Sequence, residues 1–323
     1  MRTKDRLIRM LLASGDEFIS GSVLAERFQI SRAAVWKNIK VLEREGYQIE
    51  AITNRGYRLV PDSDVVRQET VGYYLGEQIS LFDLQVYPTI TSTNACLMEQ
   101  ARQSPHWSVV VAGAQSMGRG RRGRSFFSPA DSGVYLSVLL KQNIAYTDAG
   151  LLTTAAAIAA CRAIESCTQA QAQIKWVNDV FVKGRKVCGI LTEASVNYET
   201  GTPDYVVVGI GLNVYTPDEG FPEELTGIAG SITEKRQRNL RSRLASAFLL
   251  AFYDICRNLK SPDLHEEYAH RCFILGKPVF VLKKEEKIPA EAIGILENYN
   301  LLVRYADGRE EALTGGEISI RPV

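Results

Sequence analysis

The chain has 323 residues, the length of about two average domains, and its 46% hydrophobic and 23% charged residues exclude a disordered or fibrous protein. Its net charge of +1 hides an asymmetry, because residues 1–60 carry 11 Lys/Arg against 7 Asp/Glu and the remainder carries 27 against 30. A basic N-terminal segment ahead of a slightly acidic body indicates that this segment has an anionic partner.

The cysteine and hydropathy patterns exclude two further classes. The six cysteines are scattered without a CxxC pair, so we expect reduced thiols in a cytoplasmic protein rather than a disulfide framework or a zinc site. No apolar run approaches the roughly 18 residues of a membrane span, and the purest one, residues 155–161, is ended by Arg162. We therefore expect no membrane association.

Three helices are predicted in the N-terminal segment. The first has leucine and isoleucine residues at helical spacing over residues 7–12. Ser22 is the predicted cap of a short second helix, residues 23–28. Ser31 is the predicted N-cap of a third helix that runs to about Glu45 and is ended by the following glycine.

A β-hairpin is predicted next, with strands at residues 47–52 and 57–60 around a turn in which glycine permits positive φ. Three helices and a hairpin in this order are typical of a winged helix, whose third helix enters the major groove of DNA. The alternative is a dimerisation or docking module with a solvated basic face. We favour DNA binding because the third helix leaves cations and a small residue on its open face.

Residues 61–64 are then predicted to form a polar linker.

The candidate DNA-binding residues lie on the open face of the third helix, near the starts of the second and third helices, and on the wing. They are Gly21, Ser31, Arg32, Ala33, Trp36, Lys37, Lys40 and Arg55, with Arg58 as the alternative wing cation. Trp36 has two interpretations, because an exposed indole can contact a base or sugar, whereas a large aromatic side chain more often packs against a neighbour.

The central part alternates strand-like and helical segments, which predicts a mixed α/β domain with a sizeable sheet. The β-rich runs are residues 84–87, 109–112, 134–140, 181–182 with 190–191, and 205–210, and the helical runs are residues 153–164 and 240–256. From about residue 275 the chain has short strand-like runs separated by turns, at residues 278–282, 292–296, 301–305 and 318–320. These runs predict a small all-β domain at the C-terminal end.

Residues 118–124, Gly-Arg-Gly-Arg-Arg-Gly-Arg, match the pattern GxGxxG without being a dinucleotide-binding loop. Such a loop must open a helix whose N-terminus faces pyrophosphate, whereas residues 125–129 lead into another predicted strand. The glycines let the backbone approach a ligand, and the arginines supply planar donors for a carboxylate or phosphate. The alternative is a basic surface loop for nucleic acid or for solubility.

Two other segments favour a ligand site. Residues 175–179 place a cation, an aromatic ring, an amide and a carboxylate together, with Lys186 seven residues further on, and residues 209–213 end a strand with two glycines and an amide. Several cations, one carboxylate and glycine-exposed backbone suit phosphoryl or adenylyl transfer. The chain has three histidines, so a histidine-based triad or metal site is not expected.

Taken together, these motifs resemble those of the bacterial biotin protein ligases of the bifunctional type, which also repress the biotin operon. The resemblance covers nearly the whole chain, and the matching segments are residues 31–34, 92–94, 115–123, 175–179, 185–191, 209–213 and 315–319. It implies an α+β multidomain protein. The implied domains are an N-terminal winged helix-turn-helix (residues 1–63), a central mixed α/β catalytic domain of the biotin/lipoate ligase type (64–272) and a C-terminal SH3-like β-barrel (273–323).

The resemblance also implies an activity. In that family biotin and Mg-ATP form biotinoyl-5′-AMP, which is then attacked by a lysine of the biotin carboxyl carrier protein of acetyl-CoA carboxylase. The chain would thus be an ATP-dependent, AMP-forming biotin–protein ligase without an enzyme nucleophile, in which positioning and charge stabilisation supply the catalysis. As a homodimer with the adenylate as corepressor, it would bind double-stranded operator DNA and repress biotin synthesis genes.

Two alternatives remain open at this point. One is a lipoate–protein ligase, which shares the catalytic fold, and the other is a biotin-responsive repressor with little ligase activity. The loop at residues 118–124, called the Gly-Arg loop below, and the winged helix favour biotin over lipoate. The full set of charged residues argues against a pure sensor.

By matching position, the resemblance implies three groups of site residues. The catalytic group is Lys186, Arg121, Lys175 and Asp179, where Asp179 either orients or deprotonates the acceptor lysine or only supports Lys175. The biotin-binding group is Ser92, Thr93, Asn94, Gln115, Arg119, Gly120, Arg121 and Lys186. The nucleotide-binding group is Arg124, Phe126, Lys175, Asn178 and Asn213, where Asn178 is also the implied contact of Mg²⁺. Residues 215–230 are expected to order over the adenine, and residues 315–317 either to approach the site or to form a structural turn.

Two residues depart from the family's pattern. Val177 stands where proline is common, which implies a less rigid loop. Phe126 stands where tryptophan is usual, which keeps a stacking face but loses the indole N–H. Neither change removes a charged group, so we expect both to alter affinity more than activity.

Overall fold

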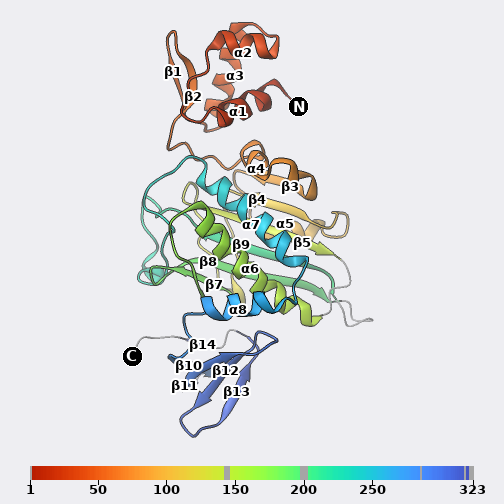
Figure 1. Cartoon of the computed structure of the whole chain (residues 1–323), viewed down its shortest axis with the longest axis vertical. Helices are drawn as coiled ribbons and strands as arrows, with labels where there is room; N and C mark the ends of the chain where they lie inside the picture. Colours follow the sequence, from red (N-terminus) through yellow and green to blue (C-terminus); the bar gives the residue numbers. More distant parts are fainter. Residues whose placement is uncertain (1, 142–145, 197–202, 284–285, 316–317, 320–323) are drawn as a thin grey trace.

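The computed structural model describes residues 2–141, 146–196, 203–283, 286–315 and 318–319. Three parts follow one another along its longest axis: helices and a hairpin at the N-terminal end, a helix-and-sheet body in the middle and a small β domain at the C-terminal end (Figure 1). The predicted α+β multidomain fold class is confirmed.

The N-terminal part has the helices and the wing of a winged helix, with a hydrophobic core of its own. Its elements are α1 (Thr3–Ala13), α2 (Gly21–Phe28), α3 (Arg32–Arg44), β1 (Ile49–Ile52) and β2 (Gly56–Leu59). Ser31 caps α3 as predicted, because its Oγ accepts a hydrogen bond from the N–H of Ala34. The prediction that Ser22 caps α2 is wrong: Ser20 has the extended backbone of an N-cap, and its Oγ accepts from the N–H of Val23.

The body is built on a seven-stranded sheet of order β3-β4-β5-β9-β8-β7-β6, in which β3 and β4 are parallel and the other neighbours are antiparallel. The strands are β3 (Asp83–Tyr87), β4 (Ser108–Ala112), β5 (Gly133–Lys141), β6 (Gln173–Lys175), β7 (Asp179–Val182), β8 (Arg185–Val196) and β9 (Pro203–Asn213). The helices are α4 (Gln68–Leu75), α5 (Thr93–Gln100), α6 (Tyr146–Cys167), α7 (Leu240–Cys256) and α8 (Pro262–Arg271), with 3-10 turns at Gly76–Leu81, Arg121–Gly123 and Glu223–Leu225.

Different helices cover the two faces of this sheet. Val109 of β4 and Val138 of β5 belong to the large core that includes α6 and α7. Their neighbours Val110 and Leu139 point to the opposite face, because side chains alternate along a strand, and pack with Leu97 of α5. The α5 face is therefore a separate, smaller layer on the sheet.

Helix α6 is the one described segment with the length and hydropathy of a membrane span, over residues 150–167, and 61% of that segment is buried inside the fold. The helix continues beyond Arg162, which ends the apolar run at residues 155–161. The Arg162 guanidinium pairs with Glu267 of α8 at the rim of the core, which leaves the apolar face of the helix continuous. Residues 150–167 are therefore described as a helix of the protein core.

The predicted polar linker at residues 61–64 is wrong in its second half, because Ser63 and Asp64 are buried. The Asp64 carboxylate accepts a hydrogen bond from the Tyr215 hydroxyl at 2.6 Å and lies 3.4 Å from the guanidinium Nε of Arg241. Burial raises the pKa of Asp64, and the charge of Arg241 opposes this. The connection between the winged helix and the body is thus a buried polar anchor rather than a solvated tether.

The C-terminal part is an antiparallel sheet of order β13-β12-β11-β10-β14, as expected for a small SH3-like barrel. Its strands are β10 (Pro278–Lys283), β11 (Glu286–Ile295), β12 (Leu301–Tyr305), β13 (Glu310–Leu313) and β14 (Ile318–Ser319). The backbone carbonyl of Tyr299 accepts a hydrogen bond from the indole of Trp176 at 2.8 Å, and the Tyr268 hydroxyl of α8 donates to the carbonyl of Val177 at 3.0 Å. Residues 175–179, with a cis bond between Trp176 and Val177, are held between α8 and this domain.

Candidate active site

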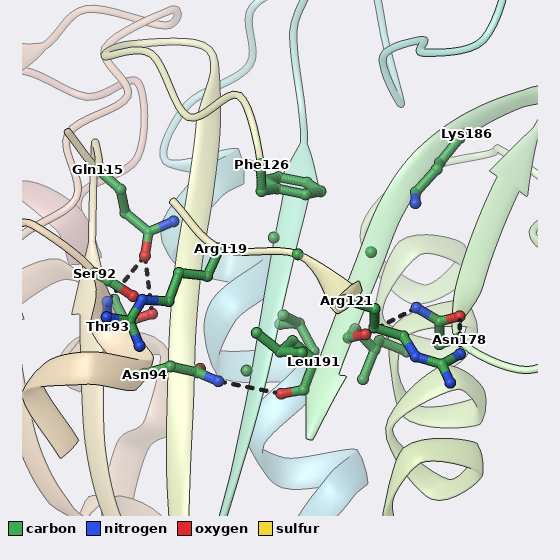
Figure 2. Close-up of a pocket in the computed structure, with 16 residues that line it drawn as sticks. Ser92, Thr93, Asn94, Gln115, Arg119, Arg121, Phe126, Asn178, Lys186 and Leu191 are labelled. Atoms are coloured by element: carbon green, nitrogen blue, oxygen red, sulfur yellow. Dashed lines mark hydrogen bonds between the residues drawn. The ribbon is translucent and has the colours of Figure 1, made fainter. Parts of the chain in front are cut away.

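A cavity on the α5 face of the sheet brings together most of the residues that the sequence singles out (Figure 2). It is lined by Ser92, Thr93, Asn94, Gln115, Arg119, Gly120, Arg121, Phe126, Asn178, Lys186, Gly189, Ile190, Leu191, Gly209, Ile210 and Gly211. These residues come from the start of α5, the Gly-Arg loop, the segment before β7, and strands β8 and β9.

The floor of the cavity is made of glycines on β8 and β9. A Cβ added at Gly209 would lie 1.9 Å from Oδ1 of Asn94, and one added at Gly211 would lie 2.4 Å from Cε1 of Phe126. Gly189, which pairs with Gly211 across the two strands, has the Phe126 ring 2.9 Å from its Cβ position. Side chains at these positions would displace the amide and the ring, so the glycines let both lie directly on the sheet.

One end of the cavity is polar and buried. Ser92, Thr93 and Asn94 are each less than 5% exposed. The N–H of Thr93 donates to Oε1 of Gln115 at 2.9 Å, and Nε2 of Gln115 donates to the hydroxyl of Ser128 at 3.0 Å. Since Gln115 uses its oxygen and its nitrogen on different partners, its amide orientation is fixed.

Lys186 and Arg121 lie at the other end of the cavity, with Phe126 and Leu191 between the two ends, while the guanidinium of Arg119 lies on the side of Ser92 and Thr93 (Figure 2). The ammonium of Lys186 is 2.6 Å from Oδ1 of Asp179, and Nη1 of Arg121 donates to Oδ1 of Asn178 at 3.0 Å. The Arg121 bond ties the Gly-Arg loop to the segment before β7.

The cations at this end are partly desolvated. Burial lowers the pKa of Lys175, whose ammonium is further affected by the attraction of Asp179 and the repulsion of Lys186. Burial also lowers the pKa of Arg121. Several partly buried cations near one carboxylate attract a ligand with more than one negative charge.

The Gly-Arg loop folds back on itself instead of opening an α-helix, which confirms that it is not a dinucleotide-binding loop. The N–H of Gly120 donates to the carbonyl of Arg124 at 2.7 Å, and a short 3-10 turn lies at Arg121–Gly123. The Cβ position of Gly315 is 3.7 Å from Nη2 of Arg121, so the chain after β13 does approach the site. The other predicted residues there, 316 and 317, lie outside the described part of the chain.

Four predicted site residues do not line the cavity. Lys175 at the end of β6 and Asp179 at the start of β7 are register partners in these two strands, and Asp179 pairs with the cavity-lining Lys186. Arg124 is exposed on the loop, and Asn213 is at the end of β9. Residues 215–230 pass beside the site, where the N–H of Lys186 donates to the carbonyl of Ile228 at 2.9 Å. The assigned roles of all these residues remain predictions.

Sequence reasoning missed two polar residues that contact the biotin-binding candidates. Ser137 of β5 is fully buried and lies 2.6 Å from Oδ1 of Asn94. Glu193 of β8 accepts a hydrogen bond from Nδ2 of Asn94 at 2.7 Å. The available signal for Ser137 was a serine among the apolar residues of β5, and Glu193 had none, because it stands beside Thr192 in a mixed stretch of β8.

The winged helix presents the other candidate surface. Arg32, Ala33 and Lys37 are exposed on α3, and Trp36 is 56% exposed, so the indole is not packed in the core. Lys40 is also exposed and pairs with Glu43 at 2.6 Å.

The contacts within the wing favour Arg55 over Arg58 as the candidate contact of a DNA phosphate. Arg58 pairs with Glu50 at 2.7 Å, whereas the guanidinium of Arg55 lies over the ring of Phe18, 4.5 Å from its centroid. Among the residues that the structure describes, Arg55 has no ion pair, so its cation is the more accessible of the two for a phosphate.

Comparisons with known proteins agree with this geometry. The model of the biotin/lipoate A/B protein ligase family matches residues 86–213, and that of the HTH domain matches residues 3–58. The chain is 34% identical over 248 residues to the bifunctional ligase/repressor BirA of Bacillus subtilis, covering 76% of each chain. It is 29% identical over 316 residues to BirA of Escherichia coli, covering 96% of this chain and 95% of the relative. The solved biotin protein ligase from Aquifex aeolicus in complex with biotin and ATP has a TM-score of 0.60 and 25% identity, covering 75% of this chain and 99% of that one.

Proposed function

We infer that this chain, which belongs to the family of the bifunctional biotin ligase/repressors, activates biotin with ATP and transfers it to a lysine of the biotin carboxyl carrier protein. The observation that carries the proposal is the two-ended cavity. Biotin has a carboxylate at one end and a ureido ring at the other. The cavity has Lys186 and Arg121 at one end and buried hydrogen-bonding groups, with Arg119 beside them, at the other (Figure 2). The distance between the two ends is spanned by Phe126 and Leu191, which suit the apolar middle of biotin (Figure 2).

The reaction needs no enzyme nucleophile. A carboxylate oxygen of biotin attacks the α-phosphorus of ATP, pyrophosphate leaves, and biotinoyl-5′-AMP is formed. The ε-amine of the carrier lysine then attacks the acyl carbon, and AMP leaves as the amide forms. Lys186, Arg121 and Lys175 reduce the repulsion between two anions that must meet, which is the electrostatic part of the catalysis.

Asp179 acts in this proposal by holding Lys186. The 2.6 Å ion pair keeps the ammonium at the cationic end before the ligands arrive. The same pair argues for a positioning role of Asp179 and against its use as the base for the acceptor lysine.

Mg²⁺ would come to the site with ATP. In the portion of the chain that the structure describes, no three His, Cys, Asp or Glu side chains gather to hold a metal ion. The phosphates of ATP would supply the main ligands, as is usual for this ion, with Asn178 as the protein contact.

For regulation, we propose that the adenylate-loaded chain forms a homodimer in the cytoplasm and binds a two-fold symmetric operator through the two winged helices. The support is the HTH domain at residues 3–58 and the ligase/repressor names of the relatives. Biotinoyl-5′-AMP would thus be both intermediate and corepressor.

The test of the ligase is a streptavidin blot. The purified chain is incubated with Mg-ATP, biotin and an isolated biotin carboxyl carrier domain, with lipoate as the competing acid. A biotin-dependent band on the carrier that lipoate does not suppress is expected. Biotin binding by calorimetry without any band would contradict the ligase and favour the sensor, and suppression by lipoate would favour the lipoate ligase.

A further inference from the structure

The segment before β7, residues 175–178, is held by two groups that do not line the cavity. The indole N–H of Trp176 donates to the backbone carbonyl of Tyr299 at 2.8 Å, and the hydroxyl of Tyr268 donates to the carbonyl of Val177 at 3.0 Å. Trp176 is 3% exposed and Tyr268 is fully buried. Burial raises the pKa of Tyr268, so its hydroxyl keeps its proton and remains a donor.

The two tyrosines belong to one packed cluster that joins α8 to the C-terminal domain. The ring of Tyr268 meets that of Tyr299 edge-on, with 5.3 Å between the centroids, and the ring of His265 meets Tyr299 at 5.4 Å. Nε2 of His265 lies 3.0 Å from the carbonyl oxygen of Leu296. Both hydrogen bonds to the segment therefore come from a support that α8 and the C-terminal domain build together.

Asn178 connects this support to the cavity. Nδ2 of Asn178 donates to the carbonyl of Ile190 at 2.9 Å, which leaves Oδ1 to accept from Nη1 of Arg121 at 3.0 Å (Figure 2). The backbone carbonyl of Asn178 accepts from the N–H of Ile190 at 2.9 Å. Both ends of the amide are thus in use, and Arg121 is held at a place that the backbone of Asn178 determines.

The hydroxyl of Tyr268 acts on that backbone directly. The carbonyl of Val177 and the N–H of Asn178 belong to the same planar peptide group. A rotation of this plane changes ψ of Val177 and φ of Asn178, and it moves the Asn178 amide relative to Arg121. The hydrogen bond from Tyr268 opposes that rotation.

We propose that Tyr268 and Trp176 are positioning residues for nucleotide binding: their hydrogen bonds place the peptide before Asn178, and through it the amide that holds Arg121. The inference rests on the proposed function, in which Asn178 and Arg121 act at the end of the cavity where ATP meets the carboxylate of biotin. Neither positioning residue touches the ligands in this proposal, so their effect must pass through Asn178.

The test is biotin-dependent exchange of pyrophosphate into ATP, measured at saturating biotin with ATP varied. Tyr268→Phe keeps the ring and removes the hydroxyl. We expect the KM for ATP to rise about fivefold, the effect of one neutral hydrogen bond, while kcat changes less than about twofold. In an Asn178→Ala background no amide remains to be placed, and we expect the same substitution to raise the KM less than about twofold.

Two further variants complete the design. Tyr299→Phe is the matched control, because it removes a tyrosine hydroxyl from the same cluster and keeps the carbonyl that binds Trp176, and it should leave the KM for ATP unchanged. Trp176→Phe removes the other donor and keeps an aromatic ring. It should raise the KM for ATP in the natural chain and have little effect with Asn178→Ala, and this second cycle decides the matter if Tyr268→Phe does not fold.

A lower kcat at an unchanged KM for ATP is the result expected if the hydroxyl only supports the fold, and it would overturn the inference. An equal rise of the KM in both backgrounds, or in Tyr268→Phe and Tyr299→Phe alike, would do the same, because the effect would then not pass through Asn178 or not depend on the hydroxyl of Tyr268. Absence of biotin-dependent exchange in the unmodified chain would instead overturn the proposed function.

Discussion

Lys186 is the residue on which the chemistry of the proposed reaction depends most directly. Its ammonium lines the cavity and is held by Asp179 rather than by solvent. Lys186→Ala should reduce adenylate synthesis by about 10²–10³-fold, as for the loss of one preorganised charge or donor at a developing anion. Biotin-dependent exchange of pyrophosphate into ATP measures this step. Lys183→Ala, which removes an exposed lysine from the adjacent turn, is the control, and near-normal exchange by Lys186→Ala would contradict the assignment.

Arg121 should retain the intermediate. Its hydrogen bond to Asn178 joins the Gly-Arg loop to the segment before β7, so its removal opens the cavity on that side. Arg121→Gly should release biotinoyl-5′-AMP and label unrelated lysines, which a streptavidin blot of added serum albumin detects. Arg122→Gly removes the neighbouring arginine, which does not line the cavity, and should leave albumin unlabelled. Equal labelling by both variants would contradict the retaining role of Arg121.

The sequence predicts the site residues that stand in recognisable motifs, such as Gln115 and Lys186, and the structure brings them together. It does not predict Ser137 or Glu193. Ser137 is a serine among the apolar residues of β5, and Glu193 stands in a mixed stretch of β8. Their partner Asn94 is 43 and 99 residues away, respectively, so no local spacing records the contacts. Which strands become neighbours in a mixed sheet depends on tertiary pairing, and local pattern carries little information about that.

At the scale of elements, the long periodic helix α7 is predicted well, whereas some of the short helices are missed. Helix α7 is found at its predicted position, residues 240–256, because it buries one face over its whole length. Helices α4 and α5 have eight residues each and were not predicted, because two turns carry little periodicity. Helix α2 has the same length and was predicted with the help of a capping serine before it. The N-cap of α2 was misplaced by two residues because Ser20 and Ser22 are both capable caps, and only the backbone conformation distinguishes them.

Helix α8 is fastened to α6 by an ion-pair group that makes its stability depend on pH. Arg271 of α8 lies 2.7 Å from Oε1 of Glu165 of α6 and 2.9 Å from Oε1 of Glu267. Partial burial raises the pKa of both carboxyl groups. Hydrogen bonds from Arg271 to Glu165, and from Arg162 and Arg271 to Glu267, outweigh this effect of burial. Both pKa values therefore lie below the ordinary value of a glutamate.

The sign of the pH dependence follows from those lowered values. Carboxylates that are stronger acids in the folded chain stabilise it above the unfolded pKa of about 4.3, and this contribution is lost as the pH falls through the folded values. Arg271→Gln should lower the free energy of unfolding by about 1–3 kcal/mol at pH 7 and by less at pH 3. Urea unfolding at the two pH values measures it, with the exposed Arg257→Gln as the control. An equal loss at both pH values would contradict the ion-pair explanation.

Over the whole molecule, the winged helix is fixed to the body by polar contacts as well as by the chain. Arg238, which precedes α7, pairs with Asp16 at 2.6 Å and donates to the carbonyl of Leu59 at 3.0 Å. Asp64 accepts from Tyr215, the first residue of the segment that we expect to cover the adenine. The Asp64–Tyr215 hydrogen bond thus joins the connection to the winged helix with the start of that segment. The proposed coupling between ligand binding and DNA binding would use a link of this kind.

This arrangement predicts that adenylate synthesis can continue when operator binding is lost. Every residue that lines the cavity lies between positions 92 and 211, and Asp64 remains in place if residues 1–63 are deleted. The deletion should therefore abolish operator binding in a gel shift while adenylate synthesis continues, because the site keeps all of its groups.

In the full chain, Lys37→Ala should weaken binding to every DNA sequence and reduce the slope of log K against log salt by about one, since one phosphate contact is lost. A gel shift that survives the deletion would place DNA recognition on the body, and a salt slope unchanged by Lys37→Ala would remove α3 from the phosphate backbone.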